Sequence, residues 1–288
     1  VQHLDGGIVA EIDVRTGDRV SAGQVLLRLD PSLLSVNLQI SRNRLAEAMA
    51  RRARLQAEQL GLEAPRFVYD ALPFPAPDTA RPEQGQRQIF AARAALIEGQ
   101  AEQTREKVLQ LDNQIAGVDA QIAAKQDQLA GLEQDRGNVT TLNEKGLVRE
   151  SQMLDLQRQR SDMLGQIAAL DSERARLSNA IRDAEIGALQ ARRQFAEEVV
   201  TDLRDTTAEI EELIPQIVTT MKQLDRVDIR APVTGVVHEM QASTVGGVVA
   251  PGATILEVIP LDRGVEFELR LDPRAVDQVH PGQAAQVV

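Results

Sequence analysis

The chain has 288 residues, of which only 2% are aromatic and none is tryptophan, so a large globular core is excluded. The net charge of -11 argues against a nucleic-acid partner, because phosphate binding needs a concentrated basic face. The absence of cysteine excludes disulfides and thiolate metal sites. There is also no run of about 18 apolar residues of the kind that predicts a membrane-spanning helix.

Residues 1–30 have the pattern of short β-strands. Apolar and other residues alternate over Gly6–Val14, and the glycines Gly17 and Gly23 mark turns before Val25–Leu29. A meander of this size has too few strands and too small an apolar face to be stable alone.

The partner of this meander is predicted far away in the sequence, at residues 229–260. When Gly7 is superposed on Gly235, Ile8-Val9 falls on Val236-Val237. A repeat between such distant segments indicates two halves of one fold. We therefore expect both segments to form a single small β-sandwich.

Three helices are predicted between these halves, at about residues 32–62, 84–142 and 150–225. Asp30-Pro31-Ser32 supplies capping residues and a proline at the start of the first helix. Residues 64–82 are predicted to be a loop, because their several prolines lack amide donors and clash with a preceding helical turn. Together the first two helices exceed the third by roughly 20 Å, so they must overlap in a local three-helix bundle.

The second and third helices carry apolar residues at alternating spacings of three and four, which is typical of a coiled-coil seam. They are predicted to fold back on each other at residues 143–149, with Gly146 in the left-handed conformation that ends a helix. Partners should then have residue numbers that sum to about 293. This register places Arg160 opposite Glu133, and Arg174 opposite Asp119.

The apolar pair Leu147 and Val148 lies at the far end of this thin hairpin, where no core can surround it. An exposed apolar tip is typical of a docking site. The alternative interpretation is that the pair only covers the last layer of the hairpin seam.

The sequence offers no candidate catalytic residue, cofactor site or metal site. His3, His238 and His280 are scattered without a second ligand at metal spacing. The many carboxylates are expected as solvated charges beside a coiled coil, and they indicate no pocket for acid–base chemistry.

Two segments carry a resemblance to a known family: Gln2–Val9, and Asp228–Val237 with its Arg230-Ala231-Pro232-Val233-Thr234-Gly235 core. Together they resemble the HlyD-like membrane fusion proteins, or periplasmic adaptors, of type I secretion systems. The resemblance implies a mixed, mainly α fold, in which a long antiparallel coiled-coil hairpin is inserted into a split biotinyl-lipoyl-like β-sandwich. A β-barrel domain would begin after the sandwich.

The expected domain limits follow from this resemblance. They are residues 1–30 with 227–260 for the split β domain, 31–226 for the helical hairpin and 261–288 for a partial β-barrel domain.

The resemblance also implies a function that is not enzymatic. The expected role is a periplasmic adaptor that links an inner-membrane ABC transporter to a TolC-like outer-membrane channel for secretion of a protein substrate. Such adaptors assemble with copies of themselves, here expected as a hexamer, and are anchored in the inner membrane by a segment absent from this sequence. The channel-docking residues are expected at the tip: Leu142, Gly146, Leu147, Val148 and Ser151.

Two alternatives remain open at the level of sequence. Drug-efflux adaptors share this architecture and often carry Arg, Leu and Ser at fixed tip spacing, a pattern that Arg136, Leu142 and Ser151 match only loosely. A lipoyl or biotinyl carrier domain would need a lysine at the turn between the half-motifs. Neither Arg28–Pro31 nor Val227–Arg230 contains one.

Overall fold

The computed structural model describes residues 1–242, 244–261, 280–282 and 284. The chain divides into two compact units, one formed by Val1–Ser41 with the chain from Pro215 onward, the other by Arg42–Ile214. We call them the β unit and the helical unit. The division falls inside the first and last helices rather than at the predicted limits 30/31 and 226/227. The physical reason is that Leu34 and Leu224, both helical, pack against the β core.

The β unit contains two small antiparallel sheets. Their strands are β1 (Gly7–Ile12), β2 (Arg19–Val20), β3 (Val25–Leu29), β4 (Asp228–Arg230), β5 (Gly235–His238), β6 (Val248–Val249) and β7 (Glu257–Pro260). One sheet has the order β4-β3-β1-β6 and the other the order β2-β5-β7. Each sheet therefore combines strands from both ends of the chain.

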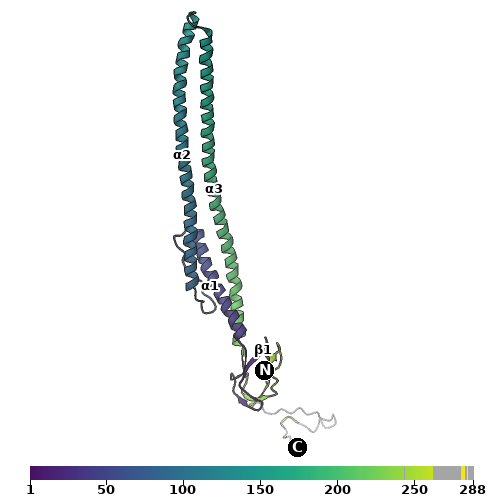
Figure 1. Ribbon diagram of the computed structural model, residues 1–288. Coiled ribbons are helices and arrows are strands. Elements are labelled where there is room, and N and C mark those ends of the chain that lie inside the picture. The colour runs from purple at the N-terminus through teal and green to yellow at the C-terminus, as the bar shows by residue number, and fades with distance from the viewer. Residues whose placement is uncertain (243, 262–279, 283, 285–288) are drawn as a thin grey trace, which may run out of the picture. The chain divides into compact units, whose positions relative to one another are not determined.

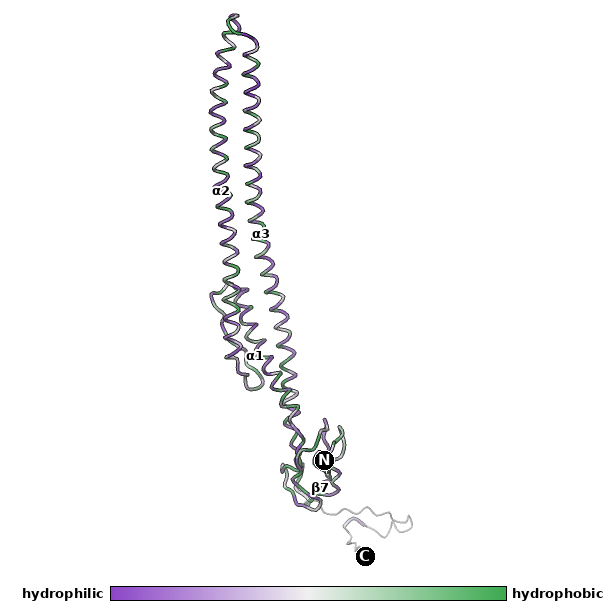
Figure 2. The backbone as a smooth tube through the Cα atoms, viewed as in Figure 1, coloured by the Kyte–Doolittle hydropathy of each residue, from purple (hydrophilic) through white to green (hydrophobic). Residues whose placement is uncertain are grey.

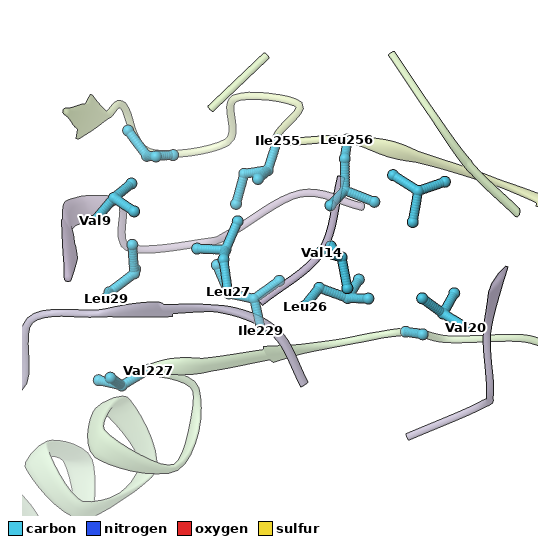
Figure 3. Close-up of a cluster of buried hydrophobic side chains, with 13 residues drawn as sticks. Val9, Val14, Val20, Leu26, Leu27, Leu29, Val227, Ile229, Ile255 and Leu256 are labelled. Carbon is cyan, nitrogen blue, oxygen red and sulfur yellow. The ribbon is translucent and has the colours of Figure 1, made fainter. Parts of the chain in front are cut away.

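The core of the β unit lies between these sheets (Figure 3). Leu26 and Leu27 from β3 are fully buried, as is Leu256 from the segment before β7. Ile229 and Ile255 complete the centre of the cluster. At its edge, Arg28 donates a 2.7 Å hydrogen bond to Asp228, and this bond lowers the pKa of the Asp228 carboxyl from its usual value.

The three helices are α1 (Ser32–Leu60), α2 (Ala80–Glu144) and α3 (Glu150–Asp225). The Asp30 carboxylate caps α1 by accepting a hydrogen bond from the Ser32 amide. None of the helices in the described residues is long and apolar enough to span a bilayer.

The start of α2 corrects the predicted limits of the loop 64–82 and of the helix 84–142. Helix α2 begins at Ala80, and Pro82 lies in its first turn, where a missing amide donor costs little because such amides have no helical partner. Asp78 accepts a hydrogen bond from the Ala80 amide. Tyr69 and Thr79 both donate to Glu83, which fixes the loop against this first turn.

The helical unit contains the predicted three-helix section. There, α1 lies beside the first turns of α2 and beside α3, whereas further along only α2 and α3 remain (Figure 1). Arg51 of α1 pairs with Glu209 of α3, and Arg93 of α2 lies over the Phe195 ring of α3. Hydrophobic and hydrophilic residues alternate along both α2 and α3 (Figure 2), as a coiled-coil seam requires.

The predicted fold class, a long helical hairpin inserted into a split β domain, is confirmed. The expected start of a β-barrel domain at 261–288 lies almost entirely outside the described residues.

One prediction concerns the close contact of β5 with β7. A β-carbon added at Gly235 would lie 2.3 Å from the Ile259 carbonyl oxygen and 2.7 Å from Val258 Cγ1. Gly235→Ala should therefore lower the free energy of unfolding of the β unit by about 1–3 kcal/mol. Hydrogen exchange of the β5 amides measures this loss.

The matched control is Gly187→Ala in α3, where an added β-carbon would meet nothing within 4 Å. Alanine also favours helix over glycine by about 1 kcal/mol, so no loss is expected there. If the β5 amides of the Gly235→Ala variant exchanged hydrogen as slowly as those of the wild type, the steric argument would be contradicted.

Candidate functional site

The candidate site is the tip of the hairpin, where α2 ends and α3 begins. Gly146 has a φ of 74°, in the left-handed region that glycine enters without steric cost. The Gly146 amide donates to the Asn143 carbonyl at 2.8 Å, and the Leu147 amide donates to the Leu142 carbonyl at 3.0 Å. These two bonds form a Schellman motif, so the predicted C-cap role of Gly146 is confirmed.

The predicted hairpin register is also confirmed. Arg160 Nε lies 2.9 Å from Glu133 Oε1, and Arg174 Nη1 lies 3.3 Å from Asp119 Oδ1. Apolar side chains buried along the seam include Leu111, Ile122, Ile167 and Leu177. A tight turn of known position is therefore sufficient to align the two helices over many turns.

The structure separates the two apolar residues of the tip. Leu147 is 71% exposed, whereas Val148 is only partly exposed. Leu142 is 41% exposed, and Gly146 and Ser151 are exposed as well. Leu147 is thus exposed at the tip, whereas Val148 is half-buried.

Below the tip, Thr140 Oγ1 lies 3.6 Å from Met153 Sδ, a contact that the sequence reasoning did not single out. The signal was present, because these two residues also satisfy the predicted register. The contact closes the seam directly beneath the turn, so the geometry of the tip is set by packing as well as by Gly146.

A concave feature lies further down the helical unit, at the end of α1. It is a groove of about 1320 Å³ along α2 and α3, and its walls include Ala94, Ile97, Ala101 and Ala188. The charged residues around it are mixed, with Glu98 and Glu106 beside Arg105 and Arg192. Such a lining offers no cluster suited to acid–base catalysis. Among the residues that the structure describes, no group of three or more His, Cys, Asp or Glu could hold a metal ion.

Comparison with known proteins gives consistent matches along the chain. A family model described as AprE, long alpha-helical hairpin, matches residues 34–223. The type I secretion system membrane fusion protein PrsE of Rhizobium meliloti (strain 1021) is 33% identical over 288 residues, which is 100% of this chain and 66% of PrsE. The alkaline protease secretion protein AprE of Pseudomonas aeruginosa is 28% identical over 291 residues, covering 100% of this chain and 67% of AprE.

The chain therefore spans about two thirds of the length of these relatives. Among solved structures, the soluble domain of LipC, a membrane fusion protein of a type I secretion system, aligns with a TM-score of 0.72 and 26% identity. That alignment covers 90% of this chain and 98% of the LipC chain.

A prediction follows for the turn at the tip. A β-carbon added at Gly146 would meet nothing within 4 Å, so backbone strain is the main obstacle to substitution. Gly146→Val should shift the thermal midpoint downward, with a cost of about 1–2 kcal/mol, because a β-branched residue resists the left-handed region.

Gly146→Asn is the matched control, since asparagine tolerates this conformation. Circular dichroism melts of both variants measure the difference. If valine and asparagine proved equally tolerated, the Schellman geometry would not be what ends α2.

Proposed function

The chain belongs to the HlyD-like membrane fusion proteins that carry an AprE-type helical hairpin, and on this premise we propose that it is the periplasmic adaptor of a type I secretion system. In this role it links an inner-membrane ABC transporter to a TolC-like outer-membrane channel while a protein substrate passes. Its relatives PrsE and AprE are named as secretion proteins, which supports secretion over drug efflux. The adaptor acts by holding its partners together rather than by catalysis.

The observation that supports this proposal most directly is the exposed apolar tip. A long hairpin that ends in a hydrogen-bonded Schellman turn presents Leu147 exposed at its end. Burying an apolar side chain of this size against another protein stabilises a complex by about 1.5–3 kcal/mol. Leu142, Gly146, Val148 and Ser151 complete the proposed docking surface.

We assign the remaining parts of the role from the family. We propose that the protein works in the periplasm and is held at the inner membrane. It assembles with further copies of itself, as a hexamer, so that the hairpins together reach the channel.

The test is the double substitution Leu147→Asp/Val148→Asp. At an exposed turn, solvent screens the new charges, so helicity should be retained and the thermal midpoint should change little. Inside a docked interface the same carboxylates would be buried without partners, so channel binding and substrate secretion should be lost. Channel binding is measured by the yield of the crosslink that a photoreactive residue in place of Lys145 forms with the outer-membrane channel. Substrate secretion is measured by an assay in cells.

A matched control is Leu96→Asp/Leu109→Asp, which adds the same charges at exposed leucines on α2 away from the tip. This variant should secrete normally. Normal secretion by the tip variant would refute docking through Leu147, and a collapse of its thermal midpoint would favour a packing role instead.

A further inference from the structure

The helices α1 and α2 are parallel neighbours whose alignment is not fixed by a tight turn. Glu47 and Arg54 of α1 contact Gln86 of α2, whereas Glu58, further along α1, contacts Arg93, further along α2. The chain between the two helices, residues 61–79, is a long irregular loop. A connection of this length can span several axial offsets of α1 against α2, unlike the turn that joins α2 to α3.

On one face of α1, apolar packing specifies the axial alignment weakly, whereas Leu45, Met49 and Leu55 are buried elsewhere on this helix. Four buried alanines, Ala46, Ala50, Ala53 and Ala57, recur along α1 at helical spacings of four and three, so they share one face. Alanine fills little volume and projects no knob into a specific hole of the neighbouring helix. Offsets that differ by one helical turn would therefore bury similar apolar area on this face.

A buried polar cluster distinguishes between these offsets. Gln86 is only 4% exposed, and its amide nitrogen donates to Glu47 Oε1 at 2.8 Å. Its amide oxygen accepts from Arg54 Nε at 2.7 Å, and Arg54 Nη1 donates to Glu58 Oε1 at 2.5 Å. The same Glu58 oxygen lies 3.3 Å from Arg93 Nε, and the Arg93 guanidinium lies 4.8 Å from the centre of the Phe195 ring of α3.

The amide of Gln86 has a donor end and an acceptor end, and α1 presents a matching pair. The acceptor Glu47 and the donor Arg54 lie one heptad apart on α1 and contact the two ends of the same amide. If α1 moved one turn in one direction, Ala50 would replace Arg54 beside Gln86. If it moved one turn the other way, Leu62 would replace Glu58 beside Arg93. Either shift leaves a buried polar group without its partner. Removing the partner of a buried charged group costs far more free energy than removing the partner of an exposed one, so other offsets are disfavoured.

We propose that the cluster Glu47, Arg54, Glu58, Gln86 and Arg93 is a register lock between α1 and α2. It selects one axial offset of these parallel helices. By doing so it fixes the level on the hairpin at which the three-helix section ends and the apolar groove at the end of α1 begins.

The test uses the absence of native cysteine, which allows two spin labels to be placed cleanly. Gln56→Cys on α1 and Gln88→Cys on α2 are exposed positions within the helical unit. Labelled wild-type protein should give one narrow distance distribution by double electron–electron resonance. The variant Glu47→Leu/Arg54→Leu/Gln86→Leu should keep its helicity and thermal midpoint. Its distance distribution should contain additional distances, which arise from molecules in which α1 is shifted along α2 by about 5 Å, one helical turn.

The matched control is Arg51→Leu/Glu209→Leu, which removes a partly exposed ion pair that also joins α1 to a neighbouring helix. Its distance distribution should stay narrow. A second variant, Gln86→Met, removes only the amide at similar volume and should broaden the distribution to a smaller extent.

A narrow, unshifted distribution in the triple variant would overturn the proposal. The same result in Gln86→Met would overturn it even if the triple variant failed to fold. Equal broadening in the Arg51→Leu/Glu209→Leu control would also overturn it, because any ion pair between helices would then have the same effect.

Discussion

The pairing of the two ends of the chain into common sheets is the constraint on which the structure depends. The sheet β4-β3-β1-β6 takes two strands from each end, and the sheet β2-β5-β7 takes one from the first end and two from the second. Isolated pairs of short strands are marginal in water, so neither end can form a stable sheet without the other. Burial of Leu26, Leu27 and Leu256 between the sheets then makes the association cooperative.

This pairing also determines where the helices begin and end. The Leu29 amide donates to the Val227 carbonyl at 3.0 Å, immediately before the start of α1 and after the end of α3. Arg226 pairs with Asp5 at 2.6 Å, and its carbonyl lies 3.1 Å from His3 Nε2. The entropic cost of closing the long insertion grows only with the logarithm of its length. A small β core can therefore close a very long hairpin.

The features that could be predicted from the sequence are those in which a few residues determine how distant parts of the chain pair. Gly146 located the turn, and a turn of known position determines which residues face each other along two antiparallel helices. Arg160 and Glu133 could be paired in this way without any structure. The half-motif repeat around Gly7 and Gly235 likewise predicted that two distant segments share one fold.

The features that escaped prediction lack such a signal. The polar cluster around Gln86 joins parallel helices across a long loop, so no turn relates its residue numbers. The first turn of α2 was missed because Pro82 was taken to exclude helix, although a proline is tolerated at this position. At the tip, periodicity did not distinguish the exposed Leu147 from the half-buried Val148, because the spacing of apolar residues along two helices carries no information about exposure in the turn between them.

The energetics of the two-helix section explain why its tip can be specialised. Both side chains of the ion pairs Arg160–Glu133 and Arg174–Asp119 are exposed. Such pairs contribute at most about 1 kcal/mol each to the free energy of unfolding. Stability must therefore come from the buried apolar layers, each of which contacts mainly the layers next to it. In such a nearly one-dimensional arrangement, a change at one end removes a single nearest-neighbour interaction and leaves the rest intact. Exposing Leu147 at the tip thus carries little cost for the fold, and the residues there are free to be selected for what they contact.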